Sequence, residues 1–278
     1  MTGDVVHALT PLHPRRGSAP LVVTVHDAVP WTYPETLTPR GVHWHRRMVT
    51  RATAEADLVV VPTQAVADAL SRHLTLREVL VVGEGVSPEL VLPEDAEARA
   101  KRLDLPERYL LTVATLEPRK GLRELVAALR DVPGVPLLCV GQAGWGDVST
   151  IASDGVEVRM LGRVSDADLA VLLHRAAALV VPSYDEGFGL PLLEGMAAGV
   201  PVLTSEAPAL VEVAAGAAVH VRLAELVDGL RQVLDDEPLR ARLRAAGPVR
   251  AAHFTWAGAA EQLWRAYAAL HERGPRQA

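Results

Sequence analysis

The sequence predicts an α/β fold built from parallel sheets with crossover helices. Short apolar runs, many of them rich in β-branched residues, alternate with longer stretches of helical pattern along the 278 residues. That alternation is typical of parallel sheets. The composition agrees, since 49% apolar and 22% charged residues are ordinary for a soluble globular α/β protein. Because only 4% of the residues are aromatic, we expect a core made mostly of Leu, Val and Ala.

The apolar runs are expected to form strands because they are short and β-branched, with turn-forming or helical sequence on either side. The expected strands are 5–8, 21–25, 58–62, 79–82, 109–114, 136–140, 156–161, 178–181, 201–204 and 218–221. The expected helices between them are 43–54, 64–73, 121–130, 165–175, 192–198, 207–213, 223–235, 238–246 and 256 to about 271.

A domain boundary is expected where Pro88 and Pro93 bracket an extended stretch. Four expected strands precede this stretch and six follow it. The predicted organisation is therefore a first domain at 1–92, a complete doubly wound domain at 93–253 and a final helical segment at 254–278.

The segment between Glu186 and Glu194 carries the clearest chemical signal. Seven residues, among them Gly187, Gly189 and Pro191, separate the two glutamates. The segment connects an apolar strand to a helix. The glycines allow positive φ and a close approach to a ligand, and the proline suits a first helical turn. Free amides at a helix N-terminus favour anions such as phosphates, and carboxylates accept hydrogen bonds from sugar diols. The alternative is a loop that leads into a capped helix, with both glutamates solvated.

Two further segments supply charged or polar groups. Lysine occurs only at positions 101 and 120, so Lys120 beside Arg119 suggests a phosphate contact, the alternative being a solvated turn charge. His26 follows an apolar strand, where ligands bind in open α/β sheets, and either contacts a ligand or caps the strand end. Asp27 either orients His26 or caps the next turn.

Three segments resemble motifs of the retaining GT-B glycosyltransferases of the glycosyltransferase 4 (group 1) family. The segment from Glu186 to Glu194 resembles its E-x7-E motif. Residues 115–122, Thr-Leu-Glu-Pro-Arg-Lys-Gly-Leu, resemble its G-x-x-x-P-R-K-G/N element. Residues 23–27, Val-Thr-Val-His-Asp, are similar to its histidine-bearing strand end. The three occur in the family's order and spacing, and the similarity extends from about position 4 to position 270.

The resemblance implies a GT-B fold of two Rossmann-like, doubly wound domains, with the final helix returning to the first. It implies that Glu186 bonds hydroxyls of a donor sugar and Glu194 the ribose diol. Arg119 and Lys120 would neutralise the pyrophosphate, and His26 would lie near the reacting sugar. The remaining implied contacts are the amides of Gly187, Phe188, Gly189 and Leu190 at the sugar and phosphates, and Val164 in the base-binding segment 161–164.

The chain also departs from the family's pattern. Its first residues match a middle strand of the family's first domain, and the glycine-rich loop has no candidate, so we expect an incomplete first domain. An apolar strand would then form an exposed edge, which usually needs covering. We therefore expect an abnormal tendency to oligomerise, or low solubility.

The implied activity is transfer of a hexosyl-type sugar from a UDP- or GDP-linked donor to an acceptor hydroxyl, with retention at the anomeric carbon. The resemblance implies neither a metal nor another cofactor, because protein cations replace the metal. The sequence does not identify the acceptor, which is expected to be a saccharide, a lipid or a small molecule. Two alternatives stay open, namely a nucleotide-sugar binding protein with weak or no catalysis and a nucleotide-sugar epimerase. A glycosidase is disfavoured, because both glutamates would line one wall of a phosphate site.

Charge and cysteine content restrict the remaining classes. The net charge of −6 argues against nucleic-acid binding, and the single cysteine, Cys139, permits no intrachain disulfide. No apolar run reaches the ~18 residues of a membrane span, and no signal peptide is recognised, so a cytoplasmic location is expected. Peripheral membrane contact through arginine-rich surface stays open. The segment with His43, His45, Arg46 and Arg47 is either a solvated face or an acceptor-binding one.

Overall fold

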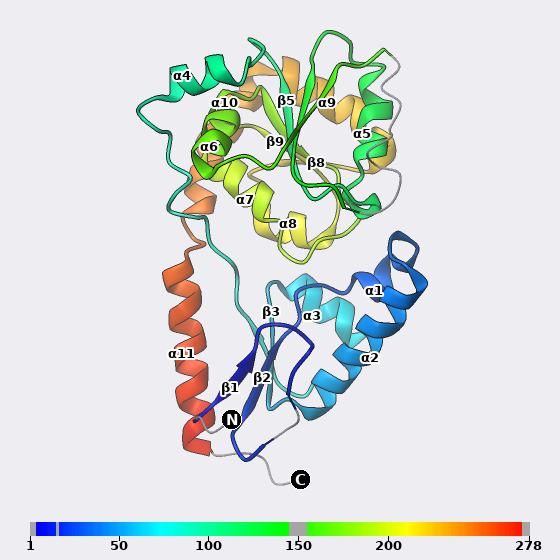
Figure 1. Ribbon diagram of the computed structural model, residues 1–278, viewed down its shortest axis with the longest axis vertical. Coiled ribbons are helices and arrows are strands. Elements are labelled where there is room, and N and C mark those ends of the chain that lie inside the picture. The colour runs from blue at the N-terminus through cyan, green and yellow to red at the C-terminus, as the bar shows by residue number, and fades with distance from the viewer. Residues whose placement is uncertain (1–3, 15–16, 145–154, 274–278) are drawn as a thin grey trace. The chain divides into compact units, whose positions relative to one another are not determined.

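The computed structural model describes residues 4–14, 17–144 and 155–273 (Figure 1). Their contacts divide the chain into two compact units. Unit 1 comprises residues 1–85, 185–188 and 254–278, and unit 2 comprises residues 86–184 and 189–253. The short segment 185–188 therefore packs with a different unit from the residues on either side of it.

Unit 1 is a parallel sheet with the strand order β1-β2-β3-β4, covered by helices on both faces. β2 and β3 are buried along their whole lengths, which explains why they read as continuous apolar runs. The strands are β1 (Val6–Ala8), β2 (Leu21–Thr24), β3 (Leu58–Val61) and β4 (Val79–Val81). The helices are α1 (Val29–Thr32), α2 (Pro39–Glu55), α3 (Gln64–Ser71) and α11 (Trp256–Arg273).

The last helix covers one face of this sheet, and α2 and α3 cover the other. Ala259 and Leu270 of α11 share a core with Val22 and Val60 of the sheet. On the opposite face, Val49 of α2 and Leu70 of α3 belong to a second core. Polar contacts also hold α11, since Tyr267 bonds His7 at 2.5 Å and Arg273 pairs with Glu78 at 2.9 Å.

Unit 2 is a doubly wound domain whose six parallel strands have the order β10-β9-β8-β5-β6-β7. Helices α5 and α9 share a core with one face, and α6, α7 and α10 lie on the other side of the sheet in Figure 1. The strands are β5 (Leu110–Val113), β6 (Leu137–Val140), β7 (Val158–Gly162), β8 (Ala178–Val181), β9 (Val202–Ser205) and β10 (Val219–Val221). The helices are α4 (Ala96–Arg102), α5 (Leu122–Leu129), α6 (Asp166–Arg175), α7 (Leu190–Ala197), α8 (Pro208–Ala214), α9 (Leu226–Asp235) and α10 (Glu237–Ala251).

Three helical features differ from the sequence-based expectation. Helices α1 and α4 were not expected, and α2 begins at Pro39 because Thr38 caps it by accepting a hydrogen bond from the Gly41 amide at 3.1 Å. Helix α10 continues past the expected end, through Gly247 and Pro248. Close packing accounts for the glycine, since a Cβ there would lie 2.9 Å from the carbonyl oxygen of Met196 in α7.

Candidate functional site

The strand order of unit 2 creates a switch point between β5 and β8. From β5 the chain continues to β6 on one side, whereas β8 pairs with β5 on the other side. Ligands in open α/β sheets bind beyond the carboxyl ends of the strands at such a point. The loop bearing Arg119 and Lys120 follows β5, and the segment that leads into α7 follows β8, so both leave the sheet there.

These two loops of unit 2 are in direct contact. The Tyr184 amide donates a hydrogen bond to the Arg119 carbonyl at 2.9 Å. Gly121 has a φ of 65°, and a Cβ on it would lie 2.0 Å from the carbonyl oxygen of Pro182. Only glycine fits at that position, so the turn after Lys120 is held against the end of β8.

Arg119 is held by a glutamate that the sequence analysis did not single out. Its guanidinium donates to the Glu117 carboxylate at 3.1 Å and 2.7 Å. Glu117 is buried, with 5% of its side chain exposed, whereas Arg119 is 15% exposed. A buried Glu117 therefore fixes the direction of the Arg119 side chain at the carboxyl edge of the sheet.

Glycine is required at positions 187 and 189 of the turn for two different structural reasons. Gly189 has a φ of 94° and caps α7, in agreement with the expectation of positive φ. Gly187 does not have positive φ, so that expectation is wrong for this residue. It is required by close packing within unit 1, since a Cβ there would lie 1.8 Å from the carbonyl oxygen of His26.

Glu194 lies on the first turns of α7 and is partly buried. Burial raises the pKa of its carboxyl group to about 7, and the negative charge of Asp166 adds to the rise. Within the described ranges the Glu194 carboxylate makes no hydrogen bond or ion pair with the protein. A carboxylate that is partly desolvated and unpaired in this way has its acceptor capacity available to a ligand.

The segment 185–188 belongs to unit 1, where contacts with several other segments hold it. Thr63 donates to the Gly187 carbonyl at 2.8 Å, and Thr32 donates to the Asp185 carboxylate at 2.5 Å. Gly187 presses on His26, as described above, and Phe188 packs edge-on against Phe254 with ring centroids 5.4 Å apart. Glu186 within this segment is itself 8% exposed.

His26 is 55% exposed and is oriented by two groups of unit 1. Its Nε2 lies 3.0 Å from the Leu9 carbonyl oxygen, and its Nδ1 lies 3.8 Å from the Glu84 carboxylate. Glu84 raises the pKa of His26 above its ordinary value, the Leu9 carbonyl adds to the rise, and partial burial opposes it. Glu84 and the Leu9 carbonyl therefore stabilise the protonated ring relative to the neutral one.

The predicted residues thus fall into two sets. His26, Glu186, Gly187 and Phe188 lie in unit 1, whereas Arg119, Lys120, Val164, Gly189, Leu190 and Glu194 lie in unit 2. Val164 is partly exposed and follows β7, immediately before Ser165, the residue that caps α6. Sequence reasoning missed the supporting residues Thr32, Thr63 and Glu84, because no local pattern identifies partners from distant segments. It also missed Glu117 and Asp185, which lie close in sequence to Arg119 and Glu186, because the motifs do not show which side chain bonds its neighbour.

A D-x-D triplet occurs at 166–168, and its second aspartate is already paired. Asp168 accepts from Arg99 at 2.8 Å, Arg102 at 2.7 Å and the Ser165 hydroxyl at 2.8 Å. Burial raises the pKa of Asp168, but the bonds from Arg99 and Ser165 outweigh this, and the net shift is downward. Among the described residues no group of three or more His, Cys, Asp or Glu side chains is arranged to hold a metal ion.

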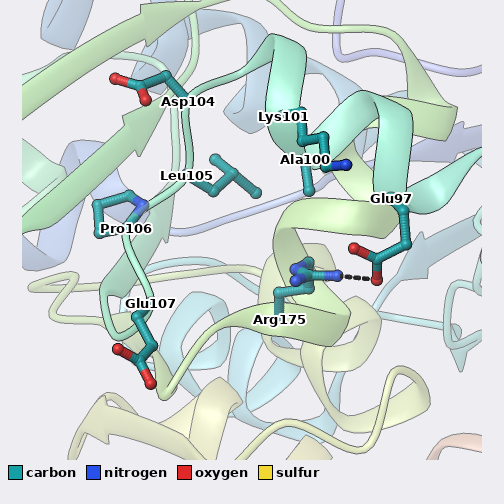
Figure 2. A pocket seen from close by; sticks show the side chains of 8 residues that line it. All are labelled: Glu97, Ala100, Lys101, Asp104, Leu105, Pro106, Glu107 and Arg175. Atoms are coloured by element: carbon teal, nitrogen blue, oxygen red, sulfur yellow. Dashed lines mark hydrogen bonds and ion pairs between the residues drawn. The ribbon is translucent and has the colours of Figure 1, made fainter.

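Unit 2 also has a hollow of about 600 Å³ away from the predicted residues. Pro106 and Glu107 precede β5, and Arg175 precedes β8, so the hollow lies at the amino ends of these strands, opposite the switch-point loops. In Figure 2, Arg175 points to Glu97, with which it forms an ion pair at 2.6 Å. The lining residues are Glu97, Ala100, Lys101, Asp104, Leu105, Pro106, Glu107 and Arg175.

Unit 1 has a basic hollow of about 560 Å³ along α2. Arg46 in this hollow donates to the Pro30 carbonyl at 2.8 Å, and Arg51 pairs with Glu55 at 2.9 Å. The lining residues are Pro39, Val42, His43, Arg46, Arg47, Thr50, Arg51 and Ala54.

No helix within the described ranges is long and apolar enough to span a membrane.

Comparisons with known proteins agree with this architecture. The family model "Glycosyl transferases group 1" matches residues 93–250, and "Glycosyltransferase Family 4" matches residues 4–90. The chain is 30% identical to O-antigen chain mannosyltransferase B of Escherichia coli over 273 residues, covering 90% of this chain and 70% of the relative. It is 34% identical to phosphatidyl-myo-inositol mannosyltransferase of Mycobacterium tuberculosis over 204 residues, covering 66% of this chain and 53% of the relative.

Solved structures show the same fold. Sucrose-phosphate synthase from Thermosynechococcus elongatus superposes with a TM-score of 0.78 at 25% identity, covering 92% of this chain and 69% of that chain. HepE of Anabaena, crystallised in complex with UDP and glucose, gives 0.76 at 21% identity, covering 90% and 72%. The expected GT-B arrangement of two parallel-sheet α/β domains is thereby confirmed.

Proposed function

The chain belongs to the group 1 glycosyltransferases of family 4, and we propose that it transfers a sugar from a nucleoside diphosphate sugar to an acceptor hydroxyl with retention of anomeric configuration. The observation that carries the proposal is the Glu194 carboxylate, partly buried beside a switch point and unpaired within the described ranges. A ribose diol would supply two hydroxyl donors to that carboxylate, which fits its unused acceptor capacity.

The donor phosphates would lie against the loops after β5 and β8. Arg119, oriented by Glu117, and Lys120 would carry the positive charge, and the amides of 187–190 would bind the sugar and the phosphates. As the sugar–phosphate bond breaks, negative charge grows on the leaving diphosphate. Preorganised donors aimed at such charge are usually the largest catalytic contribution, each worth about 10²–10³ in rate.

Glu186 and His26 would act on the sugar. Glu186 would accept hydrogen bonds from sugar hydroxyls, and protonated His26, which Glu84 stabilises, would stabilise the negative charge that develops on the leaving phosphate oxygen. We propose that the protein cations balance the diphosphate without a metal ion. Transfer that continues undiminished in excess EDTA is the expected result, whereas loss of transfer that added Mg²⁺ restores would contradict this part of the proposal.

The base and the sugar are proposed as a class, a UDP- or GDP-linked hexose. For the acceptor, the basic hollow along α2 favours an anionic saccharide or small molecule, or the surface of an anionic membrane. Within the described residues β1 pairs with β2 alone, and we propose that its other edge is covered by another chain. A sharp monomer peak in size-exclusion chromatography of well-soluble protein would contradict that last point.

A thermal-shift assay with UDP, GDP, UDP-glucose and GDP-mannose tests the function. A ligand at 100 times its Kd adds about 2.7 kcal/mol to the stability of the folded state. We expect stabilisation by at least one nucleotide, together with release of the nucleotide when a suitable acceptor is added. Stabilisation without transfer or donor hydrolysis would instead support the second candidate, a nucleotide-sugar binding protein with weak or no catalysis. No shift with any of the four would reject both.

A further inference from the structure

Asp185 is a buried carboxylate that the function described so far does not use. It is 9% exposed and lies next to Glu186 in the segment 185–188. Its two oxygens have different partners, since Oδ2 accepts from the Thr32 hydroxyl at 2.5 Å and Oδ1 accepts from the Glu186 backbone amide at 2.9 Å. Thr32 is the last residue of α1, far away in sequence.

The location of Asp185 is electrostatically unfavourable. Burial raises the pKa of Asp185, and the charges of Asp27 and Glu186 add to the rise, whereas the bonds from Thr32 and the Glu186 amide lower it. Acids placed close together in a buried site destabilise one another. A small apolar residue would avoid this cost, so a role in core packing does not account for the carboxylate.

We propose that Asp185 is a positioning residue for Glu186. The Asp185 carboxylate accepts a hydrogen bond from the Glu186 backbone amide and so fixes the nitrogen next to the Cα that carries the Glu186 side chain. The hydrogen bond from Thr32 fixes the Asp185 side chain in turn. The proposal rests on the function proposed above, in which Glu186 holds the donor sugar. It extends the sugar-binding machinery to a residue pair, Asp185 and Thr32, that never touches the substrate.

The remainder of the segment is held without Asp185. The Gly187 carbonyl accepts a hydrogen bond from Thr63 at 2.8 Å, and the Gly187 Cα packs closely against the His26 carbonyl. Phe188 packs against Phe254. Removing the Asp185 carboxylate should therefore loosen Glu186 without displacing Gly187 or Phe188. The predicted defect is confined to the sugar end of the donor, and nucleotide binding through Glu194 in unit 2 should be retained.

The experiment compares Asp185→Ala, Asp185→Asn and Thr32→Val with the parent protein. Asparagine keeps an oxygen for the Glu186 amide, and its amide group can donate to the Thr32 oxygen. Binding of UDP, UDP-glucose, GDP and GDP-mannose is measured by calorimetry, and kcat and KM are measured with the donor that binds. Asp228→Ala, which changes an aspartate whose side chain is 73% exposed on α9, is the control and should match the parent.

For Asp185→Ala we expect the nucleotide sugar to bind no more tightly than the free nucleotide. We also expect kcat/KM to fall about 10- to 100-fold, which is the effect of losing one charge-assisted hydrogen bond. Asp185→Asn should stay within about threefold of the parent, and Thr32→Val should fall between the two. Affinity for the free nucleotide should be unchanged in all three variants.

Unchanged sugar binding and rate in Asp185→Ala would overturn the inference, and so would equal losses in the Ala and Asn variants. If Asp185→Ala does not fold, Thr32→Val decides the question, since it leaves the carboxylate in place, and parent-like kinetics in that variant would reject the proposal. If the parent itself binds none of the four nucleotides, the proposed function fails instead, so the two failures are distinguishable.

Discussion

The hydroxyl of Thr63 donates a hydrogen bond to the carbonyl of Gly187 at 2.8 Å, across 124 positions of sequence. The same hydroxyl accepts from the Val66 amide at 3.3 Å and so caps α3. Thr63 is 1% exposed, so neither bond is replaced by bulk water if the hydroxyl is removed. One side chain thus links a helix N-terminus of unit 1 with the backbone beside Glu186.

Thr63→Val should lower the free energy of unfolding by about 1–3 kcal/mol, because it removes a helix cap and leaves the buried Gly187 carbonyl without this partner. Thr63→Ser keeps the hydroxyl and should lose much less. Urea denaturation of the two variants and the parent measures the difference. Equal stability of the Val and Ser variants would show that the hydroxyl contributes nothing.

Gly187→Ala should destabilise unit 1 because the new methyl group would lie 1.8 Å from the His26 carbonyl oxygen. Overpacking of this kind costs about 1–3 kcal/mol and displaces backbone. Gly17→Ala is the matched control, since a Cβ at Gly17 meets no atom of the described residues within 4 Å. Thermal unfolding should show a lower Tm for the first variant and little change for the second. A parent-like Tm for Gly187→Ala would contradict the close packing.

Glu194 and Glu186 should bind different parts of the donor. Glu194→Ala should weaken binding of the free nucleotide by about 10-fold or more, as expected for hydrogen bonds to a charged group. Glu186→Ala should leave the free nucleotide unaffected and weaken only the nucleotide sugar. Calorimetric titration with UDP or GDP and with the matching sugar nucleotide separates the two effects. Parent-like nucleotide binding in both variants would mean that the roles are wrongly assigned.

Lys120→Ala should weaken the binding of nucleoside diphosphates more than the binding of nucleoside monophosphates, because the ammonium group is expected to neutralise the outer phosphate. Lys101→Ala, which changes the other lysine of the chain, is the control and should alter neither. Competition binding with UDP and UMP, or GDP and GMP, measures the ratio. An equal loss for the mono- and diphosphates would remove Lys120 from the phosphate site.

Glu194 should also make the stability of the ligand-free protein depend on pH. Its pKa is about 7 in the folded protein against 4.5 in the reference state, so between these values the folded state binds more protons. Stability contributed by this group therefore falls as pH rises from about 4.5 and levels off above about 7. Glu194→Gln should be stabilised relative to the parent at pH 8 more than at pH 5, by about 1–3 kcal/mol. Urea denaturation at the two pH values checks this, and an identical difference at both would exclude the raised pKa.

Local sequence predicted the strands well because β2, β3 and β8, buried on both faces, must be continuous apolar runs. It predicted helices less completely. Four-residue α1 is too short to show a period, and Thr38 caps α2 before Pro39, several residues ahead of the expected start. Among the site residues, Gly189 was predicted for the right reason, whereas Gly187 is required by His26, a contact that no local pattern encodes.

The sequence by itself determined the strands, the turn between Glu186 and Glu194, and the glycine that starts α7, because these depend on φ preferences and on the polarity of neighbouring positions. Only the tertiary structure decided that β8 pairs with β5 and that 185–188 packs into unit 1 against Thr32 and Thr63. These are contacts between distant segments, and their energies are realised only once both sheets have formed.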